Sequence, residues 1–189
     1  MWSSCYEETR LIRACRVGRE SSLYRLLRLR ADIHITNKNG NQALAMASWK
    51  GRPNLVKALL AEGAEVDHAD DEGFTALSLA AQDGHIEVVR ALIDAKAAVD
   101  FADNIGVNAL ILAAHKGHIE CVQALIDAST DVHHVDNDGN TTSSLATANE
   151  HTEIIALLKA RIAQLAAVAA TASSGGKCEG KGKGKGKRG

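Results

Sequence analysis

Three histidines at a regular spacing are the residues best suited to metal binding or proton transfer. His85, His118 and His151 lie 33 residues apart, each at the start of a predicted helix. A repeating chain would hold them about one repeat apart, so we interpret their recurrence as a shared structural role. The adjacent pair His133 and His134 has no cysteine partners at the spacing of a zinc site. We therefore expect no bound metal.

The carboxylates gather at predicted turns rather than around a catalytic centre. They form clusters at residues 70–72 and 136–138, and capping and solvation of turns explain such clusters better than acid–base catalysis. The second cluster resembles a calcium-binding loop but lacks the closing glutamate. The chain also lacks the phosphate-loop, zinc-protease, nucleophile-elbow and dinucleotide-binding motifs. We therefore expect neither an enzyme nor a cofactor.

The elements that would position these residues repeat with one fixed period. Four ladders keep a step of 33 along the chain: Gly40, Gly73, Gly106 and Gly139; Gly18, Gly51, Gly84 and Gly117; Ala14, Ala47, Ala80, Ala113 and Ala146; and Leu26, Leu59, Leu92, Leu125 and Leu158. A period of this length is typical of a solenoid, in which each unit buries its apolar face against its neighbours. Function in such a protein usually lies on an extended surface.

The unit of residues 70–102 shows the local pattern most clearly. Its acidic residues and Gly73 form a turn, in which glycine allows a positive φ. Thr75 then stands at the N-cap position of a short helix, which Gly84 ends. A second helix over residues 86–93 carries an apolar stripe, and a loop leads to the next turn. The unit is predicted as helix–turn–helix plus a turn or hairpin.

The segment G-F-T-A-L-S-L-A-A-Q-D-G-H-I-E-V-V-R-A-L-I of this unit resembles the ankyrin repeat. The flanking units match in register, and the resemblance implies an all-α solenoid of about five repeats over residues 4–162. The implied units are an N-terminal cap at 4–36, repeats at 37–69, 70–102 and 103–135, and a C-terminal cap at 136–162.

Two departures from the family pattern concern the helix ends. The proline and histidine of the family's T-P-L-H motif are absent, which is expected to weaken the start of each first helix. Glu7 and Glu150 stand where glycines are expected in the outer units. Terminal repeats have one face in water and are expected to be atypical.

Charge is distributed unevenly, although the net charge is only −1. Residues 1–36 hold seven arginines and four acidic residues, whereas residues 37–162 hold nine basic and eighteen acidic residues. The acidic array argues against a nucleic-acid role for the array itself. The arginines of the first unit allow two interpretations: a solvated basic face on two amphipathic capping helices, or a docking patch for an acidic partner or anionic lipid.

Residues 163–189 are predicted as an Ala-rich extension followed by a Gly/Lys-rich tail. The tail ends in KGKGKGKRG, which cannot bury a core and is predicted to be disordered. Such a tail could contact nucleic acid or anionic membrane weakly, through salt-sensitive interactions. The start of the chain lacks a signal-peptide pattern, no apolar run is long enough to span a membrane, and the four cysteines are scattered. We therefore expect a cytoplasmic protein, with the nucleus as the alternative because the basic tract resembles a nuclear-localisation signal.

The resemblance implies a non-enzymatic adaptor or scaffold, and we expect a monomer that binds a protein partner. Contacts in the family lie on the turn tips and on the exposed positions of the inner helices. The matching positions here, taken as the predicted binding residues, are Trp49, Lys50, Asp71, Glu72, Phe74, Gln82, Asp83, Ile105, Val107, His115 and Lys116.

The apolar members of this set are the predicted anchors, because aromatic and aliphatic side chains in a polar surround resemble interface hot spots. They are Trp49, Phe74, Ile105 and Val107. A competing interpretation is that Phe74 or Trp49 packs against the neighbouring turn. The alternative function is an electrostatic tether, in which the basic tail binds nucleic acid or anionic membrane while the repeats hold a second protein.

Overall fold

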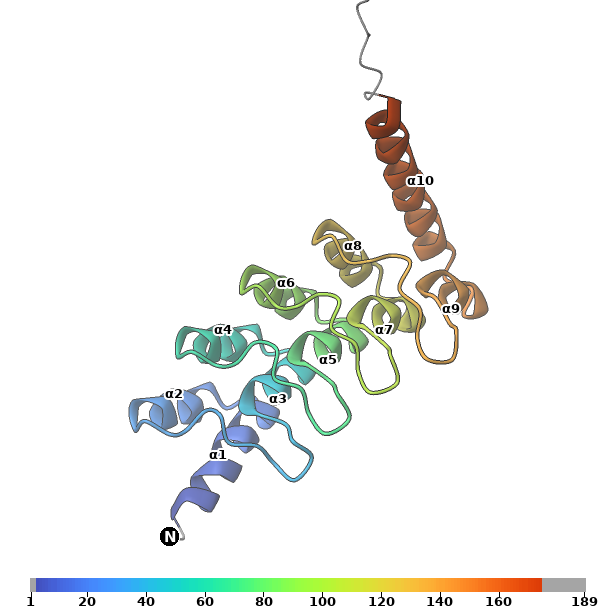
Figure 1. Ribbon diagram of the computed structural model, residues 1–189. Helices are drawn as coiled ribbons and strands as arrows, with labels where there is room; N and C mark the ends of the chain where they lie inside the picture. The colour runs from blue at the N-terminus through green and yellow to red at the C-terminus, as the bar shows by residue number, and fades with distance from the viewer. Residues whose placement is uncertain (1–2, 175–189) are drawn as a thin grey trace, which may run out of the picture.

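The computed structural model describes the backbone of residues 3–174 and the side chains of residues 10–168. Within this part of the chain, ten helices form five consecutive pairs that stack in two layers (Figure 1). The inner layer consists of α1 (Ser3–Val17), α3 (Ala43–Trp49), α5 (Ala76–Gln82), α7 (Ala109–Lys116) and α9 (Thr142–Ala148). The outer layer consists of α2 (Glu20–Arg28), α4 (Pro53–Ala61), α6 (Ile86–Asp94), α8 (Ile119–Asp127) and α10 (Thr152–Ser174). The predicted all-α solenoid is confirmed.

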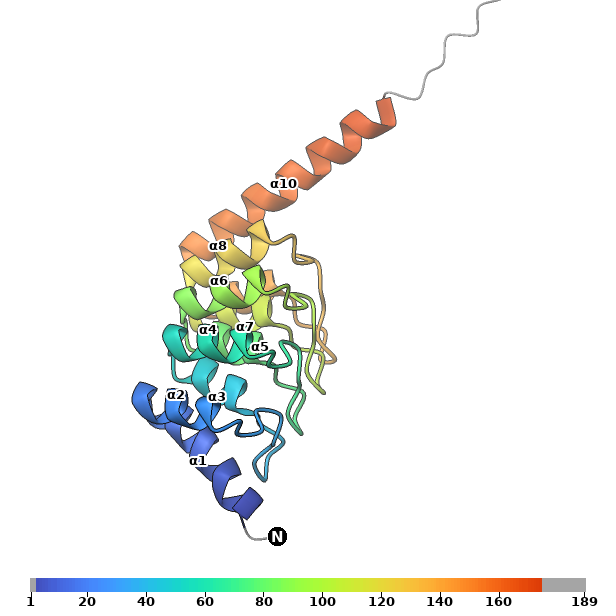
Figure 2. The same ribbon diagram turned by 90° about the vertical axis from the view of Figure 1, so that its left-hand side faces the viewer.

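Long loops join each outer helix to the next inner helix. They project together to one side of the stack, as Figures 1 and 2 show. An antiparallel bridge pairs Ala102 with Asn108 in one loop, and another pairs Val135 with Thr141 in the next. In these two loops the structure therefore has a hairpin, one of the two forms that the sequence left open.

Three of the inner helices, α5, α7 and α9, begin at side-chain caps although the proline and histidine of the T-P-L-H motif are absent. The hydroxyl of Thr75 accepts a hydrogen bond from the backbone N–H of Ser78, and the hydroxyl of Ser78 accepts one from the N–H of Thr75. Thr141 and Ser144 form the same capping box at the start of α9, and Asn108 caps α7. These bonds satisfy N–H groups that a helix leaves free at its first turn. The prediction that Thr75 is an N-cap is confirmed. The inner helix α3, which starts after Gln42, has no side-chain cap.

The core is a continuous row of aliphatic side chains between the two layers. Leu59, Leu92, Leu125 and Leu158 are fully buried, because each lies where an outer helix faces both its inner partner and the neighbouring pair. Leu26, the first member of the ladder, is only partly buried, since no earlier pair covers it. Alanines at the inner-helix contacts allow close packing of helix on helix.

The last helix runs past the predicted end of the repeat domain. α10 spans Thr152–Ser174 in one piece, so no break marks the predicted boundary between residues 162 and 163. It extends beyond the stack in Figure 2. The Gly/Lys-rich tail from position 175 onward lies outside the described residues. No helix in the described part of the chain is both long and apolar enough to cross a bilayer.

Candidate functional site

The tips of the loops form a row tied together by main-chain hydrogen bonds. In each case a backbone N–H of one tip donates to a backbone carbonyl of the preceding tip. The three bonds join Asp71 N to Asn39 O at 3.2 Å, Asn104 N to Glu72 O at 3.1 Å, and Asn137 N to Ile105 O at 3.0 Å. Because main-chain atoms make these bonds, the spacing of the tips does not depend on most of their side chains.

The acidic residues at the tips hold the turns together. Oδ1 of Asp70 accepts from the N–H groups of Glu72 and Phe74 at 3.1 and 2.8 Å. Asp103 and Asp136 make the same pair of bonds in the next two tips. The Asn140 side-chain amide, together with these N–H groups, lowers the pKa of Asp136 from its ordinary value. These carboxylates have the turn-stabilising role that the sequence predicted.

The predicted binding residues lie along the tips and the inner helices, and their exposure divides them. Six are exposed and four are half-buried. The exposed ones are Asp71, Glu72, Asp83, Ile105, His115 and Lys116, and the half-buried ones are Trp49, Lys50, Phe74 and Gln82. We call these ten residues the tip face. Ile105 is the most open of the four apolar anchors, with 60 % of its surface exposed.

Val107 was predicted as an exposed anchor, and this is wrong. Only 9 % of its surface is exposed. Its N–H donates to Oδ1 of Asp103 at 2.8 Å, and its carbonyl accepts from the Asp103 N–H. Val107 therefore closes the turn and leads the chain back into the stack, so its side chain is not available to a partner.

Trp49 is held partly by the molecule itself. Its ring packs against the core cluster, and Nζ of Lys50 lies 3.5 Å from the ring centroid. A cation over an aromatic face is an attractive contact. Trp49 therefore has a structural role, although it packs against the core and not against the neighbouring turn that the competing interpretation named. Its half-buried ring and Lys50 remain on the tip face.

The three spaced histidines join neighbouring repeats. In each of His85, His118 and His151, Nε2 lies 3.1 to 3.2 Å from a carbonyl oxygen near the end of the inner helix of the preceding repeat. Each imidazole also lies against a glycine of the preceding repeat, and these partners are Gly51, Gly84 and Gly117. The recurrence thus has the repeated structural role that the sequence suggested. In the part of the chain with described side chains, no three His, Cys, Asp or Glu side chains converge as metal ligands.

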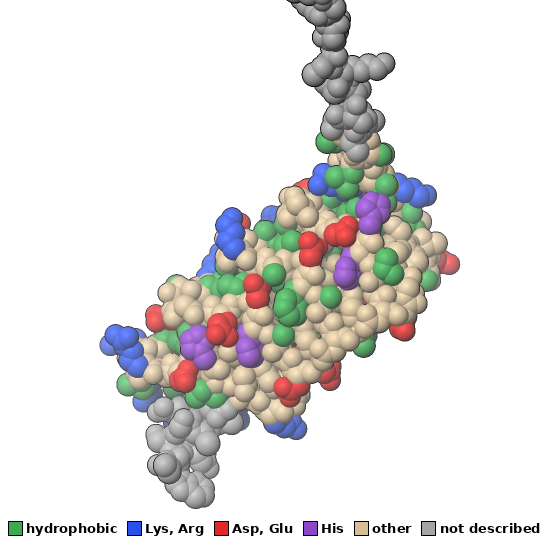
Figure 3. Space-filling view, in the orientation of Figure 1, with side chains coloured by type: hydrophobic (Ala, Val, Ile, Leu, Met, Phe, Trp, Pro, Cys, Tyr) green, Lys and Arg blue, Asp and Glu red, His purple; other side chains and the backbone are tan. Residues whose placement is uncertain are grey.

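A second histidine position was missed by the sequence analysis. Nε2 of His68 lies 2.9 Å from the carbonyl oxygen of Gly40, and His134 makes the same contact with Gly106 at 2.8 Å. Phe101 stands at the equivalent position of the intervening repeat and is 38 % exposed. Figure 3 shows histidines at both ends of this side of the molecule, with hydrophobic and acidic side chains between them. The 33-residue step between Phe101 and either histidine could have drawn attention to this position.

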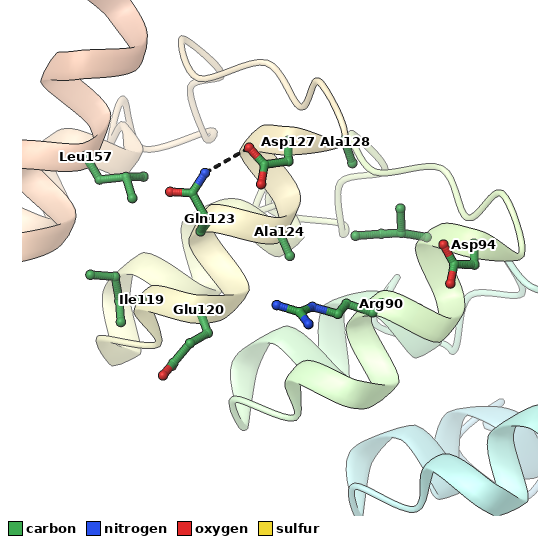
Figure 4. A pocket seen from close by; sticks show the side chains of 10 residues that line it. Arg90, Asp94, Ile119, Glu120, Gln123, Ala124, Asp127, Ala128 and Leu157 are labelled. Carbon is green, nitrogen blue, oxygen red and sulfur yellow. Dashed lines mark hydrogen bonds between the residues drawn. The ribbon is translucent and has the colours of Figure 1, made fainter.

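An open groove lies on the outer layer, whereas the predicted binding residues lie on the loop tips and the inner helices. It has a volume of about 610 Å³ and is formed by α6, α8 and α10 (Figure 4). Ile93, Ile119, Ala124 and Leu157 give it apolar walls, and charged residues such as Arg90, Glu120 and Asp127 flank them. Sequence reasoning missed it because its walls come from the half-buried flank of the apolar stripes, which are assigned to the core by their spacing.

Comparison with known protein families gives one match. The family model described as ankyrin repeats (three copies) matches residues 11–103 and residues 96–167. Together these ranges include residues of all five helix pairs of the structure. No curated protein matches the chain.

Proposed function

Because the chain belongs to the ankyrin repeat family, whose repeats are generally protein-interaction modules, we propose that it is an adaptor or scaffold that binds a protein partner through the tip face. The family is typically non-enzymatic, and we extend this to the present chain. A solenoid presents a long, rigid surface that suits an extended or folded protein partner.

The single observation that carries the proposal is the position of Ile105. This side chain is 60 % exposed, yet its backbone carbonyl is fixed by the bond from Asn137 N at 3.0 Å. The fold uses the main chain of the residue and leaves the apolar side chain in water. An apolar group displayed on a fixed backbone can be buried by a partner at a low cost in conformational entropy.

The charged residues of the tip face indicate the chemistry of the partner. Asp71, Glu72 and Asp83 place exposed carboxylates on the neighbouring repeat. Lys116 is an exposed cation on the inner helix of the same repeat as Ile105. We propose that the partner contributes an apolar residue to Ile105, with basic residues facing the carboxylates, because complementary charges guide association and fix register.

Affinity capture with matched variants tests the proposal. Ile105→Asp places a charge at the anchor, whereas Leu165→Asp makes the same change at a 39 % exposed leucine on α10. A partner should be retained by the wild type and by Leu165→Asp and lost with Ile105→Asp. The double variant Trp49→Ala/Phe74→Ala should weaken retention as well, and thermal melts should show that each protein is folded.

Equal retention by all four proteins would contradict binding through the tip face. Loss with both aspartate variants would indicate a nonspecific response to added negative charge. Loss only when residues 175–189 are removed would favour the electrostatic tether instead.

A further inference from the structure

A second surface, independent of the tip face, lies at the N-terminal end of the stack. The helices α1 and α2 lie at this end (Figure 1), and their side chains line a groove of about 640 Å³. Four arginines line it, namely Arg10, Arg13, Arg19 and Arg25, and all are exposed. Apolar side chains, including Val17 and Leu29, line the same groove.

The four arginines present free donors within the part of the chain whose side chains are described. Among the residues whose side chains are described, none of the four takes part in an ion pair. Glu20 is the acidic residue of α2, and its Oε1 accepts a hydrogen bond from Nδ2 of Asn54 at 3.0 Å. A guanidinium presents several N–H donors in a planar fork, so these groups have donor capacity that the described structure does not use.

The groove is not shaped to receive another repeat of this chain's own kind. Arg10 occupies the position that holds a buried alanine in the next three repeats, where Ala43, Ala76 and Ala109 are at most 2 % exposed. In those repeats the inner helix packs against the preceding inner helix, and a small buried side chain suits such close packing. A long charged side chain at position 10 prevents the same close approach.

Solvation of an end cap does not account for the composition of the groove. A cap that needs only solubility is served by charges of both signs, whereas the charged side chains that line the groove within residues 10–168 are all positive. Val17 and Leu29 are also 49 % and 66 % exposed, which a solvated cap does not require. Cations around exposed apolar side chains are complementary to an acidic segment that carries an apolar residue.

We propose that the α1–α2 groove binds an acidic peptide segment of a protein partner, with carboxylates paired to the arginines and an aliphatic side chain placed between Val17 and Leu29. Arginine pairs with carboxylates through two parallel hydrogen bonds, which gives geometric specificity as well as attraction. A concave site suits a peptide better than a flat bilayer. The adjoining array, with eighteen acidic and nine basic residues over positions 37–162, would also be repelled by an anionic membrane.

A defined peptide probe tests the proposal without knowledge of the natural partner. The probe is a fluorescent peptide of about twelve residues, rich in glutamate and carrying two leucines, and its binding is followed by anisotropy. Arg13→Glu/Arg25→Glu reverses two charges inside the groove. The control, Arg16→Glu/Arg28→Glu, makes the same change in net charge at exposed arginines outside the groove lining.

The groove pair should weaken binding by about tenfold or more, and the control pair by about twofold or less. A peptide with serines in place of the leucines should bind several-fold more weakly to the wild type. Melting curves confirm folding, and Arg13→Gln/Arg25→Gln, which adds no negative charge, serves if the reversal unfolds the chain.

Equal losses in the two pairs would overturn the proposal, because overall charge rather than the groove would then explain the attraction. Absence of peptide binding by the wild type would overturn it too. Vesicles containing phosphatidylserine provide the last arm: if they bind through the groove arginines while the peptide does not, the groove is a membrane site and the proposal is wrong.

Discussion

Gly84 and His118 form a contact between neighbouring repeats that leaves no room for a side chain at position 84. A Cβ added to Gly84 would lie 2.5 Å from Nδ1 of His118, well inside van der Waals contact. Nε2 of the same imidazole lies 3.1 Å from the carbonyl oxygen of Gln82. The glycine has φ +75°, in the left-handed region. The residue therefore serves two needs, a backbone conformation and a place for the ring.

Gly84→Ala should destabilise the protein by about 2–4 kcal/mol, because left-handed strain and the clash with the imidazole add together. Gly63→Ala is the matched control. Gly63 has φ +87° with nothing within 4 Å of an added Cβ, so only strain of about 1 kcal/mol is expected. Urea melts measure both. Adding His118→Ala to Gly84→Ala should recover part of the loss, and a simple sum of the two single losses would show that the ring and the methyl group do not meet.

Loss of a helix cap should depend on whether water can replace it. Thr75 is 2 % exposed, and Thr75→Ala should cost about 1–2 kcal/mol, because it leaves the Ser78 N–H without its partner in a buried place. Thr141→Ala removes the same bond to Ser144, which is exposed, so water can take over and the cost should be smaller. Denaturant melts of the two variants provide the comparison, and a larger loss at Thr141 would contradict the reasoning.

Truncation of the leucine ladder should cost most in the middle of the stack. Leu92→Ala or Leu125→Ala should each destabilise by about 2–5 kcal/mol, through lost burial and the cavity left behind. Leu158 is equally buried, but no helix pair follows α10 within the described residues, so its surroundings can collapse more easily and the loss should be smaller. Equal losses at the three sites in urea melts would show that α10 is as rigid as the inner repeats.

Two buried thiols should make the protein less stable in alkali. Burial raises the pKa of Cys15 to about 12. Burial, with the nearby carboxylates of Glu120 and Glu87, raises the pKa of Cys121 to about 11. In the unfolded chain the thiols lose their protons near the ordinary pKa of 9.0. The contribution of the protonated thiols to the free energy of unfolding is therefore complete below pH 9 and is lost as pH rises toward 11 and 12. The decline is at most about 1.4 kcal/mol per pH unit for each thiol.

The thiol contribution is isolated by comparison with Cys15→Ala/Cys121→Val. Other groups titrate alike in both proteins, so the free energies of unfolding should converge above pH 9. A constant difference between the two proteins at all pH values would show that the thiols do not titrate on unfolding.

Removal of the basic tail should show whether the repeats or the tail bind the partner. The cut belongs after Ser174, where α10 ends, since a cut near the predicted domain end at residue 162 would remove half of that helix. Binding through the tip face should survive this truncation and weaken only modestly with salt, because buried apolar anchors are little screened. Steep salt dependence, with binding lost on truncation, would indicate the tether. Titrations at low and physiological salt measure the difference.

The repeat period was enough to predict the helix pairs, the turns and the Thr75 cap, because each depends on residues close together in the sequence. The contacts between repeats were harder to predict from the sequence. The fit of His118 to Gly84 joins residues from different units, and the period places both without showing that they touch. Val107 was misplaced for the same reason: its position in the motif is near the tip, but whether a side chain there points outward depends on how the turn closes.

The glycines that face the histidines also explain why Glu150 can depart from the family pattern. Glu150 has φ +60° at the position where the inner repeats have glycine, and it is exposed. In the part of the chain that the structure describes, no histidine of a later repeat packs there. The backbone strain is retained at this position, but the steric reason for glycine is gone, so a residue with a side chain is tolerated.

The main-chain bonds between tips have a consequence for how such a surface changes over time. Since N–H and C=O groups join neighbouring tips, substitution of an exposed side chain that makes no bond between tips, such as Ile105, alters what the row recognises while leaving its spacing intact. Asn104 and Asn137 are exceptions, because their side-chain amides donate to carbonyl groups of the preceding tip. Recognition and scaffold are thereby separated at the level of individual atoms. A single substitution at a position such as Ile105 is therefore expected to change which partner binds while the stack stays folded.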